Sequence, residues 1–402
     1  MRTLLDPAGH PHRMRALHLS ITPLVGAPGN ICRALQQRPG VQARWCVLQH
    51  SVGSYSTMGF ELDLTWERDR DEVIALADGA DVLHLHNFID LQTQDFAPID
   101  LAALWRAGKP MLRHFHSTPQ AVARYMRSTE ATVQACPIPK LVIAQYPERY
   151  YPTARVVPNV VFAPANTQRQ RPRGATVRIG YAPSRFNPGR AARWDTKGYP
   201  ETCKMLRRLQ ASARRAGVSL EVDVIEQVTH AESLRRKADC DVFIDDLVTG
   251  SYHLNTLESL VLGVACVTYL DGRMLRTLYE ATGQVDFPVI NVGLEHAHDV
   301  LLNACRDPES IHAIGAHSRQ WMGQHWPAPT VADVFLGIYR DVIAEPRASF
   351  PRRFGNDEIG RWLSVGGDDA LWAARRPHWP QLAPEWMSKT RGTLGRLLKG
   401  RG

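Results

Sequence analysis

The sequence lacks the features that mark membrane-spanning and secreted proteins. No stretch of its 402 residues is long and apolar enough for a transmembrane helix, and its beginning has no apolar core of signal-peptide length. The seven cysteines are scattered and odd in number, and none forms a CxxC pair. We therefore expect reduced cysteines in the core of a cytoplasmic protein.

Several catalytic signatures are also missing. The chain has no GxSxG motif and no Gly-x4-Gly-Lys-Ser/Thr motif, which argues against a serine hydrolase and a P-loop nucleotidase. The glycine loop at 26–29 is not GxGxxG and lacks the acid that NAD binding needs. Two pairs, Asp69/Asp71 and Asp239/Asp241, match a DxD metal pattern in letters only. We interpret both pairs as solvated acids.

Positive charge is concentrated in the last part of the chain. The net charge is +8, and after Pro346 eleven Lys/Arg stand against five Asp/Glu. The nearly neutral remainder argues against a nucleic-acid groove, so we expect no nucleic-acid partner. The same tail holds four of the ten tryptophans. It predicts either peripheral attachment to the anionic inner face of a membrane, or a helix that packs its tryptophans on the protein.

β-like and helical runs alternate through the rest of the chain. A polar, proline-containing stretch, Ala163–Ala175, interrupts the alternation, and a second series starts at Val177. This pattern predicts an α/β protein with two Rossmann-like domains facing a central cleft. The expected parts are residues 1–165 and 166–330 for the two domains, 331–345 for a closing helix and 346–402 for the basic tail.

The segment 238–269 predicts a strand, a loop, a helix and a second strand. The apolar run Val242–Ile244 ends in Asp245 and Asp246, and a helical segment follows that carries Glu258 and stops at Gly263. The order places a carboxylate and the helix N-terminal amides at the carboxyl edge of a parallel sheet. Ligands of open α/β sheets bind at that edge, and anions are attracted to helix N-termini.

Two cations follow the first strand of the second series. Arg185 lies just after Tyr181, and Lys197 precedes Gly198. A diphosphate needs cations that donate hydrogen bonds, and both residues stand at the mouth of the same strand–loop–helix. Arginine and lysine are also common on solvated loops, and that reading stays open.

Four histidines end two strand candidates. His84 and His86 share one side of their strand, and His114 and His116 share one side of theirs. Such a group suggests zinc, but no Asp, Glu or Cys joins it at ligand spacing, so we expect no metal. We interpret His84 and His86 as structural and leave His116 open between a structural and a functional role.

Together these pieces resemble the GT-B nucleotide-sugar glycosyltransferases, in particular the bacterial family 4-like enzymes. The resemblance covers residues 14–345, with the marks Gly26–Gly29, Asp81–His84, His116, Val157–Asn159, Arg185, Lys197–Gly198 and Leu257–Val267. It implies metal-independent, retaining hexosyl transfer of the kind used in polysaccharide biosynthesis. By resemblance, Glu258 holds the donor ribose, Arg185 and Lys197 neutralise the diphosphate and His116 positions the sugar. Tyr252, Leu254, Asn255 and Thr256 complete the donor site, and Gly26, Gly29 and Asn87 face the phosphates and the acceptor.

The chain departs from this family at one position. The family often carries two glutamates with seven residues between them; the second matches Glu258, and the first falls on Gly250 here. This leaves three readings: a transferase that moves sugar to a glycan, lipid-linked or small-molecule acceptor, a degenerate protein that binds without turnover, and a sugar-nucleotide epimerase. An epimerase needs acids near the sugar for proton transfer, and the sequence shows no convincing set. No cofactor is expected, since the nucleotide-sugar is the substrate.

Overall fold

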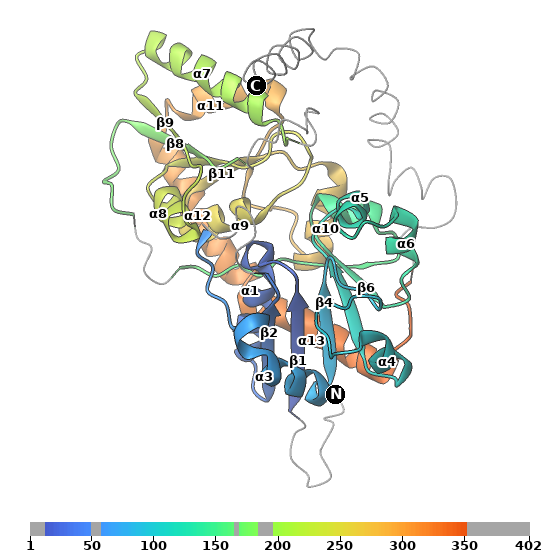
Figure 1. Ribbon diagram of the computed structural model, residues 1–402. Helices are drawn as coiled ribbons and strands as arrows, with labels where there is room; N and C mark the ends of the chain where they lie inside the picture. Colours follow the sequence, from blue (N-terminus) through green and yellow to red (C-terminus); the bar gives the residue numbers. More distant parts are fainter. Residues whose placement is uncertain (1–12, 50–57, 165–168, 184–195, 352–402) are drawn as a thin grey trace, which may run out of the picture. The chain divides into compact units, whose positions relative to one another are not determined.

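A computed structural model describes residues 13–49, 58–164, 169–183 and 196–351. They form one compact unit with two parallel β-sheets (Figure 1). Arg185 and most of the predicted basic tail lie outside the described residues.

The first sheet has seven strands in the order β3-β2-β1-β4-β5-β6-β7, all pairing in parallel. The strands are β1 (Met14–Ser20), β2 (Val41–Val47), β3 (Leu64–Thr65), β4 (Val82–His86), β5 (Met111–Phe115), β6 (Lys140–Ile143) and β7 (Arg155–Val157). The helices between them are α1 (Ala27–Gln36), α3 (Trp66–Gly79), α4 (Leu101–Arg106), α5 (Pro119–Tyr125) and α6 (Glu130–Ala135), with 3-10 turns η1 (Leu24–Gly26) and η2 (Tyr146–Tyr150).

The second sheet has five parallel strands in the order β12-β11-β10-β8-β9. They are β8 (Val177–Tyr181), β9 (Leu220–Val224), β10 (Val242–Ile244), β11 (Ala265–Thr268) and β12 (Ile290–Asn291). The helices of this half are α7 (Tyr199–Arg215), α8 (His230–Ala238), α9 (Leu254–Leu262), α10 (Gly272–Thr282), α11 (Leu294–Ala304) and α12 (Pro308–His325). The two parallel sheets confirm the predicted α/β fold class of two Rossmann-like units.

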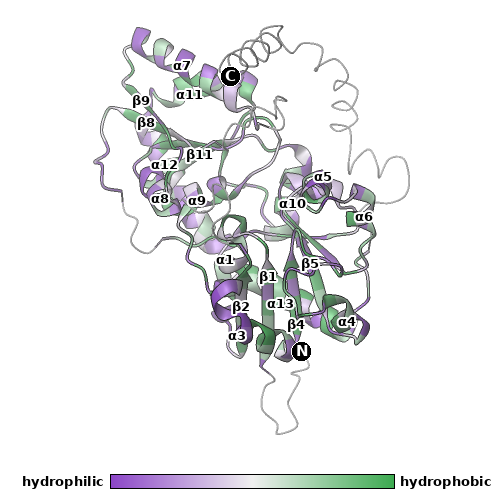
Figure 2. Ribbon diagram, viewed as in Figure 1, coloured by the Kyte–Doolittle hydropathy of each residue, from purple (hydrophilic) through white to green (hydrophobic). Residues whose placement is uncertain are grey.

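Burial explains why these segments form these elements. Every residue of β4, β5 and β10 is buried, as expected for strands covered on both faces. Helix α7 alternates hydrophilic and hydrophobic residues (Figure 2), and it buries Met205, Leu206, Leu209 and Ala213 along one side. That spacing follows the helical period, so one stripe of α7 faces the core.

The last described helix, α13 (Ala328–Ala344), packs against α1 and β4 of the first sheet. The chain thus returns from the second half to the first, and it buries Phe335 and Tyr339 there. No element was predicted between Tyr269 and Pro329, where the structure has α10, β12, α11 and α12. Among the described residues, no helix combines the length and the apolarity needed to cross a bilayer.

Candidate functional site

The strand order gives each sheet one topological switch point. β1 has β2 on one side and β4 on the other, and β8 has β9 and β10 on its two sides. In open α/β sheets, ligands bind outside the carboxyl ends of the strands at such a point. The loop of Gly26 follows β1, and Asn87 follows β4. The segment before Lys197 follows β8, and Asp245 follows β10. Of the predicted site residues, Gly26 and Asn87 directly follow strands of the first switch point, β1 and β4.

The loop after β1 has an unusual backbone. Leu24, Val25 and Gly26 have consecutive positive φ angles of 48°, 55° and 74°. A left-handed conformation costs about 1–3 kcal/mol for a residue with a side chain, and such residues cluster at binding sites. Gly29 has a packing reason instead, because a Cβ there would lie 2.6 Å from the ring of Trp45. The strained part of the loop is thus the part ahead of α1.

Asn87 joins the ends of β4 and β5. Its φ is 48°. Its Oδ1 accepts the backbone N–H of His116 at 2.6 Å, and its Nδ2 donates to the Ser117 hydroxyl at 3.1 Å. Asn87 is fully buried, so its side chain fixes the position of His116 at the sheet edge.

Behind His116 lies a hydrogen-bonded row of five histidines and one tyrosine, here called the histidine ladder. Its members in bonding order are His114, His84, Tyr339, His18, His86 and His116, with contacts of 3.1, 2.8, 2.9, 3.1 and 2.9 Å. Burial lowers the pKa of all five imidazoles, for His18 and His116 to about 3. His18 and Tyr339 were not among the predicted residues, although His18 lies between two leucines of a predicted strand, a signal that was available.

In the second sheet, the acid pair after β10 stabilises the following loop and helix. Asp245 Oδ2 accepts the backbone N–H of His253 at 3.0 Å and the hydroxyl of Thr256 at 2.5 Å, so it fixes the N-terminal end of α9. Burial would raise the pKa of Asp245, but His253 and then Lys197 and Thr256 hold it below its ordinary value. Asp246 accepts the N–H groups of Val248 and Thr249 at 2.8 and 2.9 Å.

Glu258 lies in α9 as predicted and is buried. Its carboxylate forms an ion pair with the buried Lys237 of α8 and a 2.7 Å contact with His230. Burial would raise the pKa of Glu258, but Lys237 and then His230 hold it below its usual range. Lys237 also donates to Asn255 Oδ1 at 2.6 Å, and Asn255 donates to the carbonyl of Ala182 after β8. The strand end, α8 and α9 thereby form one polar cluster.

The remaining predicted donor residues occupy different environments. Lys197 is half-buried and has a φ of 52°. Leu254 is partly buried at the start of α9, whereas Tyr252 is fully buried among Phe287 and Trp326. Burial raises the pKa of Tyr252 far above its ordinary value, and its hydroxyl has no hydrogen-bond partner among the described residues. The side chain of Tyr252 thus lies in the core in this structure.

Gly250 has a φ of 71°, and the carboxylate of Asp271 lies beside it. Asp271 forms an ion pair with the buried Arg149 of η2, and Arg149 also donates to the carbonyl of Thr249 at 3.1 Å. These contacts join the first half of the chain to the loop that carries Gly250.

The interpretation of Asp239 and Asp241 as solvated acids is wrong. Both are buried. Asp239 accepts hydrogen bonds from the backbone N–H groups of Gln170 and Arg171, and Asp241 accepts hydrogen bonds from Arg169 and Arg178. They tie the segment before β8 to the sheet, which the sequence pattern did not reveal.

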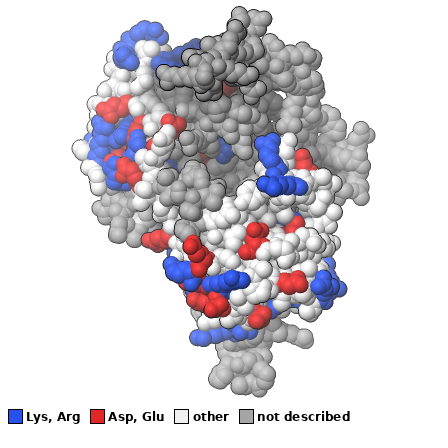
Figure 3. Space-filling model, in the orientation of Figure 1, with Lys and Arg blue, Asp and Glu red and all other residues white. Residues whose placement is uncertain are grey.

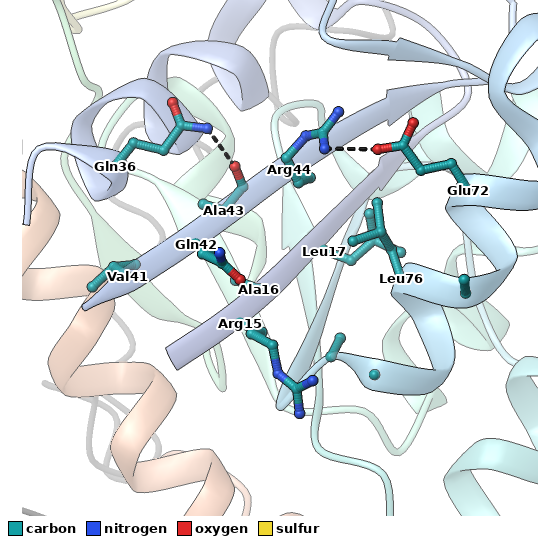
Figure 4. A pocket seen from close by; sticks show the side chains of 13 residues that line it. Arg15, Ala16, Leu17, Gln36, Val41, Gln42, Ala43, Arg44, Glu72 and Leu76 are labelled. Carbon is teal, nitrogen blue, oxygen red and sulfur yellow. Dashed lines mark hydrogen bonds and ion pairs between the residues drawn. The ribbon is translucent and has the colours of Figure 1, made fainter. Parts of the chain in front are cut away.

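A pocket of about 500 Å³ lies away from the carboxyl ends of the strands (Figure 4). Arg15, Gln42 and Arg44 line it near the amino ends of β1 and β2, with Glu72 and Gly79 of α3 on the other wall. The switch-point rule concerns the carboxyl ends, so this pocket is separate from the candidate site. On the face shown in Figure 3, basic and acidic side chains are interspersed over the described surface.

No model of a protein family matches the chain, and no curated protein matches it in sequence. Solved structures are similar to it over most of its length. A sucrose-phosphate synthase from Thermosynechococcus elongatus has 12% identity, covers 83% of this chain and 100% of its own, and has a TM-score of 0.48. An O-GlcNAc transferase from Thermobaculum terrenum has 17% identity, with 83% and 68% covered and a TM-score of 0.46.

A UDP-GlcNAc 2-epimerase from Neisseria meningitidis, bound to UDP-GlcNAc, has 10% identity to this chain. It covers 82% of this chain and 100% of its own, with a TM-score of 0.44. At these identities the likenesses do not assign a reaction. The chain has the predicted α/β architecture of two parallel Rossmann-like sheets, each with its own switch point.

Proposed function

We propose that this protein transfers a sugar from a nucleotide-sugar donor to a glycan, lipid-linked or small-molecule acceptor. The observation that carries the proposal is Glu258, a carboxylate that is buried and kept ionised beside the switch point of the second sheet. Lys237 and His230 bond different oxygens of this group. Because a carboxylate oxygen accepts more than one hydrogen bond, Glu258 can also accept from the two hydroxyls of a ribose.

The other parts of the proposed reaction follow from charge and position. Lys197, together with Arg185, stabilises the diphosphate as negative charge develops on the leaving group. His116 is held by Asn87 at the edge of the first sheet and positions the sugar. The strained loop of Val25 and Gly26 contacts the acceptor side. The proposed chemistry is retaining hexosyl transfer, in which Lys197 and Arg185 stabilise the diphosphate without a metal ion.

The binding test uses isothermal titration calorimetry with UDP, GDP, ADP and TDP on the full chain. Lys197→Ala and Arg185→Ala should each weaken diphosphate binding by about 1–3 kcal/mol, the contribution of a charge-assisted hydrogen bond. Lys204→Ala, an exposed lysine of α7, is the matched control and should change nothing. Unchanged affinity in both site variants contradicts the diphosphate assignment.

The ribose assignment has its own test. Wild-type protein should prefer a nucleoside diphosphate over its 2′-deoxy form, and Glu258→Gln should remove that preference because the amide is a weaker acceptor. Comparing two ligands on one variant separates recognition from folding. Equal discrimination by wild type and variant contradicts the role of Glu258.

A binding protein without turnover is the second candidate, and Gly250 favours it. The position where the family carries a glutamate has no side chain, and Asp271 lies in the adjacent space paired with Arg149. Incubation with sugar nucleotides separates the candidates. Slow release of free sugar indicates a transferase, an isomerised sugar on an intact nucleotide indicates an epimerase, and binding without either product indicates the degenerate form.

A further inference from the structure

The histidine ladder is the largest group of metal-ligating side chains among the described residues. One ring nitrogen from each of three ladder histidines lies within 4.8 Å of the other two, in two overlapping sets. The sets are His18/His84/His86 and His86/His114/His116. Neutral imidazole is the form that binds a metal, and burial lowers the pKa of each of these histidines.

The first set is a poor ligand group. The rings of His84 and His86 stack nearly parallel, with centroids 4.5 Å apart and planes 9° apart. Ring lone pairs lie in the ring planes, so stacked rings do not aim them at one point. Both nitrogens of His84 and both of His18 are also hydrogen bonded within the ladder.

The second set has the required free atom. His114 is 1% exposed, and its Nε2 has no hydrogen-bond partner among the described residues. His86 Nδ1 and His116 Nε2 are 2.9 Å apart, and the ring planes of the set are inclined by 34–37°. Two nitrogens on a tetrahedral zinc ion are roughly 3.3 Å apart, given Zn–N bonds of about 2.0–2.1 Å. His116 is only half-buried, which leaves a route for entry.

We infer that His86, His114 and His116 form a binding site for a zinc-class divalent cation, with Tyr339 as its supporting hydroxyl. Three protein ligands leave a fourth position of a tetrahedral ion for water or substrate. The site lies at the carboxyl edge of the first sheet, apart from the acids of the second sheet. It shares His116 with the proposed transferase site, but metal binding is measured without turnover, so the two proposals can fail separately.

The hydrogen bonds of the ladder support this ligand set. When His86 donates through Nε2 to His18, and His18 donates to Tyr339, His86 Nδ1 carries a lone pair that a metal can take in place of the contact with His116. When His114 donates through Nδ1 to His84, and His84 donates to Tyr339, the Nε2 lone pair of His114 is free as well. Both series of hydrogen bonds end on the oxygen of Tyr339, which lies 2.9 Å from His18 Nε2 and 2.8 Å from His84 Nδ1. Outer partners of this kind fix the tautomer of metal-bound histidines.

The test is metal binding by the full chain after removal of metal with EDTA. Dialysis against Zn²⁺ and elemental analysis should give one zinc per chain in the wild type and in His10→Gln/His12→Gln, which removes two histidines of the N-terminal region. His114→Gln and His116→Asn should lose it. His18→Gln should keep it with about 10–100-fold weaker affinity, as for an outer partner.

Loss of zinc from a variant could also result from unfolding. Co²⁺ gives a second readout that avoids this ambiguity. The wild type should show visible bands of tetrahedral cobalt without a thiolate charge-transfer band, which excludes the cysteines as ligands. His116→Cys should add that thiolate band if residue 116 is a ligand. Absence of zinc from the wild type, or a cobalt spectrum that His116→Cys does not change, overturns the site and leaves the ladder as a metal-free hydrogen-bonded core.

Discussion

Asp271 lies where a side chain at position 250 would have to go. A Cβ built on Gly250 would be 2.7 Å from Asp271 Oδ2 and 2.9 Å from its Cγ. Asp271 is fixed there, because its Oδ1 caps α10 through the N–H of Met274 at 2.8 Å and its Oδ2 pairs with Arg149. A side chain at position 250 would therefore disturb the ion pair of Asp271 with Arg149.

Gly250→Ala should destabilise the protein more than the backbone angle alone predicts. Gly283→Ala is the matched control, since Gly283 has a φ of 70° and nothing within 4 Å of its Cβ position. The control should lose about 1 kcal/mol of unfolding free energy in urea, and Gly250→Ala about 1–3 kcal/mol more from overpacking. Equal losses would show that the Asp271 contact relaxes freely.

Lys237→Met should be strongly destabilising. Lys237 is 1% exposed, and its removal leaves the buried carboxylate of Glu258 with His230 as its remaining ionisable partner among the described residues. Breaking a buried ion pair costs about 3–5 kcal/mol. Urea unfolding measures the loss, and the double variant Lys237→Met/Glu258→Gln should recover part of it. Arg276→Met, which breaks an exposed pair with Glu280, should have little effect.

Glu258 should also make stability depend on pH in the acid range. Its folded-state pKa lies below the unfolded value of about 4.3, so the unfolded chain binds the proton more readily. The stabilisation is present in full above that value and is lost as pH falls through the lower folded-state pKa. The stability difference between wild type and Glu258→Gln should therefore be largest near neutral pH and shrink below pH about 4.3. A constant difference across this range would contradict the lowered pKa.

Binding of a nucleoside diphosphate should not require Mg²⁺. The acids at the second switch point already accept hydrogen bonds from protein groups, Asp245 from His253 and Thr256, and Asp246 from Val248 and Thr249. Mg²⁺ needs oxygen ligands that are free to bind it. Calorimetric affinity for UDP should be the same with Mg²⁺ and with EDTA. A strict Mg²⁺ or Mn²⁺ requirement would mean that Asp245 and Asp246 reorient to bind metal.

The basic tail should attach the protein weakly to anionic bilayers. A truncation after Pro351 keeps the contacts of Arg347 with Trp105 and of Arg155 with Phe350. It removes a segment with ten Lys/Arg and five Asp/Glu. Each basic residue near an anionic membrane surface contributes about 1 kcal/mol to membrane binding. Truncation should abolish co-sedimentation with anionic liposomes at low salt and keep nucleotide binding. Equal sedimentation of both forms would reject the membrane role, and unfolding of the truncated form would assign the tail to the core.

The fold class could be predicted from the residues alone, because hydrophobic period, turn residues and helix stops are local signals. The structure places Gly26 and Asn87 after β1 and β4, the strands of the first switch point, and Glu258 within α9. Their roles in a binding site stay predictions. The tertiary structure decided which groups meet. Tyr339 reaches His18 across 321 positions, Lys237 neutralises Glu258 and Asp271 fills the space beside Gly250. Such contacts depend on how helices pack on the sheets, and no residue pattern within one segment encodes them.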